Sequence, residues 1–160
     1  GDEMDEDIIN YIRSKYNILI GERTAEDIKI SMGSAMPMKK EKKMNVQGRD
    51  LLTGLPKSID LSSIEVREAI MNSISIITES VKDAIEETPP ELLKDLLTTG
   101  VSLTGGGALI RGLDAFWAKE LNIPINIVED PLSTVARGTA LMLDHIDLLE
   151  RVQKSWEELV

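Results

Sequence analysis

The segment Val101-Ser102-Leu103-Thr104-Gly105-Gly106-Gly107-Ala108-Leu109-Ile110-Arg111-Gly112-Leu113 carries the strongest structural signal in this chain of 160 residues. Its first four residues suit a buried strand, three glycines follow, and a helix is predicted directly after them, to about Leu121. Glycine lacks a Cβ, so its backbone adopts positive φ and lets another group approach closely. The start of a helix presents unpaired N–H groups and a positive dipole end, which together favour a phosphate or a nucleotide.

Two common nucleotide motifs do not fit this segment. A P-loop requires Lys followed by Ser or Thr after its last glycine, whereas Leu113 and Asp114 follow Gly112. A dinucleotide-binding fingerprint would place a glycine where Ile110 stands. On spacing alone, the three glycines fit a purely structural turn between a strand and a helix as well as they fit a nucleotide site.

Composition and charge exclude several classes of function. The chain has no cysteine, so it has no disulfide and no thiolate metal site, which fits a reducing cytoplasm. A net charge of −10 would repel a phosphate backbone, so we expect no nucleic-acid partner. No apolar run approaches the roughly 18 residues of a membrane span. The single histidine, His145, has only Asp144 and Asp147 beside it, so we predict no metal site there.

The first half of the chain reads as a small α+β unit. The expected elements are a helix over residues 4–16, an apolar turn over 18–21, a helix over 24–33, a loop over 34–43, and strands over 44–49 and 56–61. Thr24 is predicted to cap the second helix, with Asp27 in the position of a capping box. Ile59 and Leu61 alternate with polar residues, which predicts that both face a core.

The second half alternates helices and strands. The expected elements are a helix over 62–87, a short helix ending at Gly100, a strand over 101–104, a helix to 121, a strand over 125–128, and helices over 133–143 and 146–156. Ser62 and Glu65 form a capping box that begins the longest helix. Its expected buried stripe comprises Val66, Ala69, Ile70, Ile74, Ile77, Val81 and Ile85. Four leucines, Leu92, Leu93, Leu96 and Leu97, are expected to bury the short helix. The β-α-β-α order predicts parallel strands in a covered sheet.

Several ordered motifs resemble the MreB family, the actin-like rod-shape-determining proteins of bacteria. The matching segments are Gly1–Asp5, Ile20–Lys29, Gly48–Leu51, Gly54–Pro56, Thr88–Leu92, Leu103–Leu109 and Asp130–Gly138. The glycine turn by itself indicates only the wider superfamily of actin, sugar kinases and heat-shock chaperones. The sequences Gly-Glu-Arg-Thr-Ala-Glu and Pro-Pro-Glu-Leu narrow the resemblance to MreB.

The resemblance implies an α/β fold of the actin-like, ribonuclease H-like ATPase type, of which this chain is the second domain, the C-terminal half. Residues 1–70 would form the small α+β outer subdomain, and residues 71–160 the inner α/β subdomain with the glycine turn. The chain begins at Gly1 rather than at a methionine, so we expect a piece of a longer protein. The parent family is a slow ATPase coupled to polymerisation. Its phosphate loops and magnesium-handling groups would lie upstream, so we expect no catalytic or metal-binding residue here and no hydrolysis by this chain alone.

The resemblance also implies the adenosine side of a site for ATP or ADP with Mg²⁺. The residues that it assigns to cofactor binding are Glu26, Asp27, Ile28, Lys29, Gly105, Gly106, Gly107, Ala108 and Leu109. A carboxylate at Glu26 would accept hydrogen bonds from ribose hydroxyls, and the Lys29 stem would cover the adenine. The alternative is that Glu26 and Lys29, three apart on one helix face, form an exposed ion pair worth roughly 0–1 kcal/mol.

For the parent protein, the resemblance implies membrane-associated filaments that control rod shape and guide cell-wall synthesis from the cytoplasmic face of the cell membrane. The implied partners are further copies of the same protein, a membrane-anchored adaptor such as RodZ, the wall-elongation machinery, and the membrane surface through residues outside this chain. The Lys39–Lys43 cluster is interpreted as a solvated loop. Two alternatives stay open: another ATPase of the superfamily, and an interaction domain without a nucleotide role.

Overall fold

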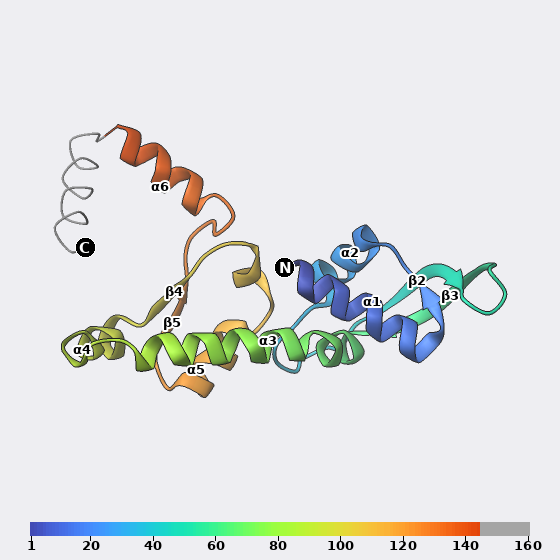
Figure 1. The fold of residues 1–160 in the computed structure, drawn as a ribbon, viewed down its shortest axis with the longest axis horizontal. Helices are drawn as coiled ribbons and strands as arrows, with labels where there is room; N and C mark the ends of the chain where they lie inside the picture. Colours follow the sequence, from blue (N-terminus) through green and yellow to red (C-terminus); the bar gives the residue numbers. More distant parts are fainter. Residues whose placement is uncertain (145–160) are drawn as a thin grey trace.

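One long helix, α3 (Ser63–Glu86), runs along the molecule and carries a group of elements at each end (Figure 1). The computed structural model describes residues 1–144, so His145 and the expected helix over 146–156 lie outside the described residues. The other elements are α1 (Asp2–Tyr16), β1 (Ile18–Leu19), α2 (Glu22–Met32), β2 (Lys43–Asp50), β3 (Pro56–Ser62), α4 (Pro90–Thr99), β4 (Val101–Leu103), the 3₁₀ turn η1 (Gly106–Leu109), α5 (Leu113–Leu121), β5 (Ile125–Ile127) and α6 (Thr134–Leu143).

The first group of elements is a three-stranded antiparallel sheet, in the order β1-β2-β3, packed against α1, α2 and the start of α3. Val46 pairs with Ile59 across β2 and β3, and Leu61 is two residues further along. These three side chains are buried among Ile8, Ile12, Ile28 and Ile70. The alternation predicted for the second strand is therefore confirmed, because the apolar side of the sheet meets the helices.

Strand β1 occupies residues predicted as an apolar turn, so that prediction was wrong. Ile18 pairs with Asp50 and Leu19 with Arg49 at the edge of β2. A Cβ built on Gly48 would lie 2.5 Å from the carbonyl oxygen of Leu19. The bare backbone of Gly48 lets β1 approach β2, and the sequence periodicity of a two-residue strand is too short to reveal this pairing.

The beginning of α2 also differs from the sequence prediction. The helix starts at Glu22 and Gly21 occupies the N-cap, with no side-chain cap, so Thr24 lies inside the first turn. The capping assignment of Thr24 was wrong, because the N-cap, Gly21, lies three residues before the cap that the Thr-x-x-Asp pattern suggested. The inner face of α2 is confirmed, since Ala25, Ile28 and Met32 are buried as predicted.

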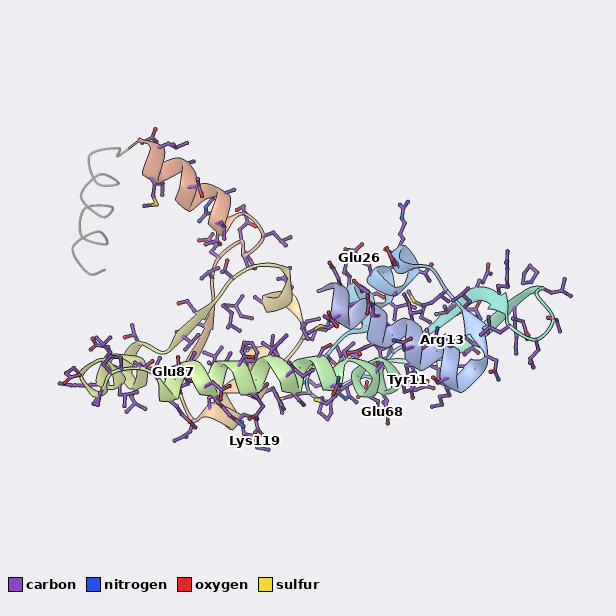
Figure 2. All side chains as sticks on the ribbon, viewed as in Figure 1. Tyr11, Arg13, Glu26, Glu68, Glu87 and Lys119 are labelled. Atoms are coloured by element: carbon purple, nitrogen blue, oxygen red, sulfur yellow. The ribbon has the colours of Figure 1, made fainter. Side chains whose placement is uncertain are left out.

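Helix α3 begins with the predicted capping box: Glu65 N donates to Ser62 Oγ, and Ser62 N donates to Glu65 Oε2. Side chains on α1 cross to α3, as in the bond from Tyr11 Oη to Glu68 Oε2 at 2.9 Å (Figure 2). Of the predicted stripe, Val66, Ile70 and Ile74 are buried, and Ala69, Val81 and Ile85 are partly buried. Ile77 is 41% exposed, because its neighbour Thr78 faces inward at that turn of the helix.

The second group contains β4 and β5, paired in parallel as the β-α-β order predicted. Gly100 takes φ +78° and packs against Pro124, where a Cβ would overlap the Pro124 carbonyl. Trp117 of α5 donates a 2.8 Å hydrogen bond to Thr78 Oγ1, which ties this group to α3. The boundary predicted at residue 70 falls within the continuous helix α3, and the division into two subdomains stays a prediction.

Helix α4 contradicts the expectation that its leucines are buried. The helix has no buried residue, and Leu92 and Leu97 are 54% and 62% exposed. Proline at its first position is confirmed. Leu93 and Leu96 are only partly buried, because in the described residues little packs against this helix.

Candidate nucleotide-binding site

Lys29 of α2 points to the start of α1. Its Nζ lies 2.7 Å from Asp5 Oδ2 and 3.3 Å from the carbonyl oxygen of Gly1. The two side chains are only 14% and 13% exposed. The ion pair between Glu26 and Lys29 that the spacing allowed is therefore not formed, because the ammonium group has better acceptors across the helix pair.

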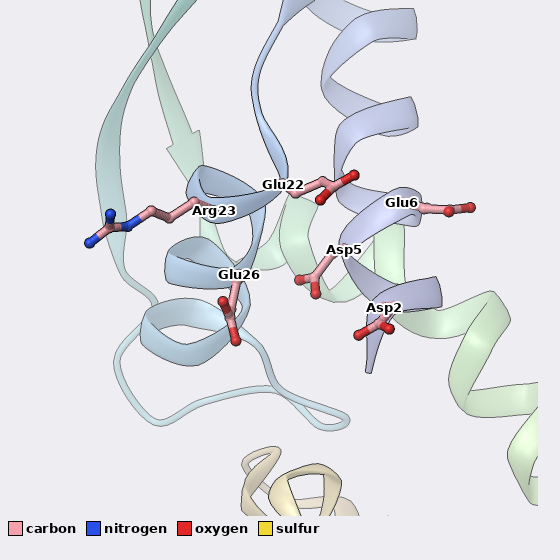
Figure 3. Close-up of a pocket in the computed structure, with 6 residues that line it drawn as sticks. All are labelled: Asp2, Asp5, Glu6, Glu22, Arg23 and Glu26. Atoms are coloured by element: carbon pink, nitrogen blue, oxygen red, sulfur yellow. The ribbon is translucent and has the colours of Figure 1, made fainter.

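Glu26 lines an acidic pocket between the N-terminal ends of α1 and α2 (Figure 3). The cavity has a volume of about 690 Å³, and its lining residues are Asp2, Asp5, Glu6, Glu22, Arg23 and Glu26. Figure 3 shows the Arg23 side chain pointing to the far side of α2, away from Asp5. Carboxylates are hydrogen-bond acceptors only, so this pocket suits the hydroxyl groups of a sugar and repels phosphate.

Asp5 was not among the predicted site residues. The sequence pattern indicates only that Asp5 is one of several acidic residues at a helix start, and it does lie in the first turn of α1. Within residues 1–144, its Oδ1 is buried and has no hydrogen-bond partner, while its Oδ2 is held by Lys29. A buried carboxylate oxygen with spare acceptor capacity is suited to a hydroxyl donor from a ligand. Nothing in the sequence distinguished Asp5 from Asp2 or Glu3.

The glycine turn is built differently from the prediction. Gly105 takes φ +79°, its N–H donates to the Pro131 carbonyl, and a single 3₁₀ turn follows over Gly106–Leu109. The α-helix begins only at Leu113, so the expectation of a helix directly after the glycines was wrong. The positive dipole end of an α-helix therefore does not lie at the glycines. The turn still leaves its first N–H groups, those of Gly106 and Gly107, without a partner inside the turn.

Open space adjoins the glycines. A Cβ built on Gly105 or Gly107 would meet nothing within 4 Å, and one on Gly106 would lie 3.5 Å from Leu132 Cδ2. Ala108 is buried and anchors the turn, whereas Leu109 is 53% exposed. The three glycines are thus not needed to avoid a clash with the described protein, apart from the positive φ of Gly105. This geometry fits a surface that a ligand approaches closely.

Arg111 joins the two halves of the predicted site. Its Nη1 donates to the carbonyl oxygens of Ile30 and Gly33 at the end of α2, at 3.2 and 3.3 Å. Its own carbonyl accepts from Ala35 N at 2.8 Å. The segment that follows the glycine turn is thereby bound to the helix that carries Glu26 and Lys29. No pattern in the sequence indicated this role for Arg111.

The family model described as MreB/Mbl protein matches residues 1–151 of the chain. This chain belongs to the MreB/Mbl family. It is 46% identical to the cell shape-determining protein Mbl of Bacillus subtilis, over 94% of this chain and 45% of Mbl. It is also 46% identical to the cell shape-determining protein MreB of Escherichia coli, over 92% of this chain and 43% of that protein. The chain therefore spans less than half the length of these relatives.

Solved structures establish the actin-like α/β fold. MreB5 of Spiroplasma citri, crystallised with ADP, superposes with a TM-score of 0.89 and 42% identity, covering 91% of this chain and 44% of MreB5. The double helical filament of MamK superposes with a TM-score of 0.66 over 81% of this chain and 39% of MamK, at 22% identity. The predicted family and fold class are confirmed, and the assignment of individual site residues stays a prediction.

The described residues do not offer a metal site. Between residues 1 and 144, no group of three or more His, Asp or Glu side chains is arranged to hold a metal ion. The five carboxylates of the acidic pocket line its walls without converging on one point (Figure 3). Likewise, no helix in the described part of this MreB/Mbl chain is long and apolar enough to cross a membrane.

Proposed function

We propose that this chain supplies the nucleoside-binding half of an ATP-binding, actin-like protein that forms filaments and controls cell shape. The observation that carries the proposal is the pair of hydrogen bonds from Arg111 to the carbonyl oxygens of Ile30 and Gly33. These bonds hold the segment after the glycine turn beside the end of α2. A family of cell shape-determining proteins and a solved relative that holds ADP support it.

In this proposal, Glu26 and the free Oδ1 of Asp5 accept hydrogen bonds from the ribose hydroxyls. Lys29 compensates the charge of Asp5, and the exposed part of its side chain, 14%, would contact the adenine through its methylene groups. The backbone N–H groups of Gly106 and Gly107 donate to the sugar or the first phosphate. Each of these groups binds or orients the nucleoside, and none takes part in chemistry.

Asp27, Ile28, Ala108 and Leu109 complete the set of proposed contacts. Ile28 and Ala108 are buried, so they act by holding α2 and the glycine turn in place. Leu109 is half exposed and offers an apolar contact to the base. Following the family resemblance, Mg²⁺ binding and ATP hydrolysis are proposed to depend on residues of the parent protein outside this chain.

The wider role is proposed for the parent protein, because this chain spans less than half of its relatives. We propose ATP-dependent filaments on the cytoplasmic face of the cell membrane, with an adaptor such as RodZ and the wall-elongation machinery as partners. A filament of MamK, a protein with the same fold, is consistent with self-association. The match to the MreB/Mbl family model disfavours another ATPase of the superfamily.

Electron microscopy of the full-length protein, with and without ATP and Mg²⁺, tests this proposal. Gly106→Trp should block the nucleotide and abolish filaments, because the indole fills the open space over the turn. Gly106→Ala is the matched control: its Cβ makes only an ordinary contact with Leu132, so filaments should persist. Monomers of the wild-type protein under every condition would refute the filament proposal. Filaments that form without nucleotide, and that form equally well with Gly106→Trp, would show that polymerisation does not depend on this site.

A further inference from the structure

Arg67, near the start of α3, is an arginine that lies almost out of solvent. Its side chain is only 13% exposed. Nη1 donates to Ser34 Oγ at 3.0 Å and to the Met36 carbonyl at 3.1 Å, and Nη2 donates to Glu41 Oε1 at 2.9 Å. A nearly buried guanidinium is costly unless well-placed acceptors satisfy its donors. All three acceptors come from the segment between α2 and β2, so Arg67 holds that segment to α3.

Glu41 fixes the far end of this segment. The lysines around it are exposed, as expected of a solvated loop, but the Glu41 side chain is only 28% exposed. Its Oε2 accepts from Ser63 Oγ, while its Oε1 accepts from Arg67. Hydrogen bonds from Ser63 and Arg67 lower the pKa of the Glu41 carboxyl, so this group is charged near neutral pH. Arg67 and Glu41 therefore form an ion pair that closes the segment against α3.

The start of the same segment contacts the residues that follow the glycine turn. Ser34 is fully buried and pairs with Arg111 in an isolated parallel bridge. Ala35 N donates to the Arg111 carbonyl at 2.8 Å. A Cβ built on Gly112 would lie 3.3 Å from Met36 Cβ, which is a tight approach. This junction, residues 34–36 against 111–112, leaves little room for the two segments to shift.

We propose that Arg67 is a positioning residue for the nucleoside site: by fixing the junction to α3, it sets where the glycine turn stands relative to Glu26 on α2. Arg67 is not among the residues that line the acidic pocket, so it acts through the junction and does not touch the nucleotide. Arg111 holds the same junction from the other side. A ligand loses less free energy on binding when the two walls of its site are already in place. This inference rests on the proposed nucleotide binding and adds a remote residue that controls it.

The test measures binding of a fluorescent ATP analogue to the full-length protein with Mg²⁺. Arg67→Met removes the guanidinium and keeps an apolar stem, and it should weaken binding at least about fivefold. Arg67→Lys should recover only part of that loss, because an ammonium group cannot replace the planar fork of donors. Lys57→Met is the matched control: it breaks the ion pair with Asp50, also at 2.9 Å, in the same sheet but at the β2–β3 turn. It should lower the urea midpoint, yet leave the affinity within about twofold of the wild type.

A double variant separates positioning of the site from general loss of stability. If Arg67 and Arg111 act through the same junction, removing the second side chain adds little once the first is gone. The combination of Arg67→Met with Arg111→Gln should therefore weaken ATP binding by less than the product of the two single effects. Losses that multiply in this double variant, or an unchanged affinity in Arg67→Met, would overturn the proposal.

Ser34→Ala provides a milder variant in case Arg67→Met does not fold. It removes one bond between Arg67 and the junction and keeps the ion pair with Glu41. It should weaken ATP binding about twofold to fivefold and speed amide exchange at Ala35 N, which bonds to the Arg111 carbonyl. If neither the affinity nor the exchange changes, Arg67 does not position the site. Failure of the wild type to bind the ATP analogue would instead refute the proposed nucleoside site, and this inference with it.

Discussion

Lys29 Nζ lies 2.7 Å from Asp5 Oδ2, and this ion pair joins α2 to the first turn of α1 away from most solvent. Helices α1 and α2 otherwise meet through apolar side chains such as Ile8 and Ile28. The pair therefore sets the relative position of the two helices at the mouth of the acidic pocket, where Glu26 also lies.

Asp5→Asn should destabilise the protein by about 1.5–3 kcal/mol, because Lys29 then loses its charged acceptor in a nearly buried position. Glu3→Gln, an exposed carboxylate in the same helical turn, is the control and should change the free energy of unfolding by no more than about 0.5 kcal/mol. Urea unfolding followed by circular dichroism measures both. Equal effects of the two substitutions would mean that the ion pair contributes nothing specific.

Glu26→Gln should weaken ATP binding by about tenfold, because a charged acceptor for the ribose hydroxyls becomes neutral. The same substitution should leave the affinity for 2′,3′-dideoxy-ATP unchanged, since that nucleotide has no hydroxyl to donate. Glu91→Gln is the control, because this exposed carboxylate of α4 does not line the pocket shown in Figure 3. Titration of the full-length protein with both nucleotides checks the prediction. An equal loss for both would indicate that Glu26 does not contact the sugar.

The sequence predicted the elements that rest on periodicity and on local capping. The Ser62 and Glu65 capping box, the alternating strand with Ile59 and Leu61, and the parallel β4–β5 pair are all found. The capping box and the alternating strand depend on residues close together in the chain. The parallel pair depends on a β-α-β connection, which is almost always right-handed. Local patterns therefore sufficed for most of the fold.

The errors arose where a distant segment decides the local structure. Strand β1 exists because Gly48, 30 residues later than Ile18, leaves room for it. The alternative ion pair between Glu26 and Lys29 is not formed, because Asp5, 24 residues before Lys29 in the chain, accepts from the ammonium group. The glycine turn was located correctly, but its 3₁₀ form and the hydrogen bond from Gly105 N to the Pro131 carbonyl, 26 residues later, were not predicted. Pairing between remote residues leaves no periodic trace in a single sequence.

Arg111→Gln should reduce nucleotide affinity more than it reduces stability. The side chain makes two hydrogen bonds to carbonyl oxygens at the end of α2, and its loss would let the glycine turn move relative to Glu26. We expect at least a fivefold weaker affinity for ATP, about 1 kcal/mol, and faster amide exchange across Gly105–Leu109. Arg13→Gln, whose side chain bonds to Asn10 on the exposed side of α1, should change neither measurement. Unaltered exchange in Arg111→Gln would show that the bridge does not order the turn.

The stability of the first group of elements should fall in acid through Glu65. Burial by itself raises the pKa of this carboxyl, but hydrogen bonds from Ser62, Tyr16 and Lys15 outweigh it and lower the pKa to about 2. The unfolded chain has a pKa near the ordinary 4.5, so between about pH 4.5 and 2 the unfolded state binds the extra proton. The contribution of Glu65 is therefore complete above pH 4.5 and is lost as the pH falls toward 2.

Glu65→Gln isolates this contribution, because the variant has no group to protonate at that position. The difference in urea midpoint between the wild type and the variant should be largest at pH 6 and should shrink steadily toward pH 3. Asp50, whose pKa is also lowered to about 2 by Lys57 and the turn N–H groups, titrates in both proteins and cancels in the difference. A difference that stays constant from pH 6 to 3 would mean that Glu65 ionises alike in the folded and unfolded chain. In that case its hydrogen bonds to Ser62 and Tyr16 would stabilise the neutral and charged forms equally.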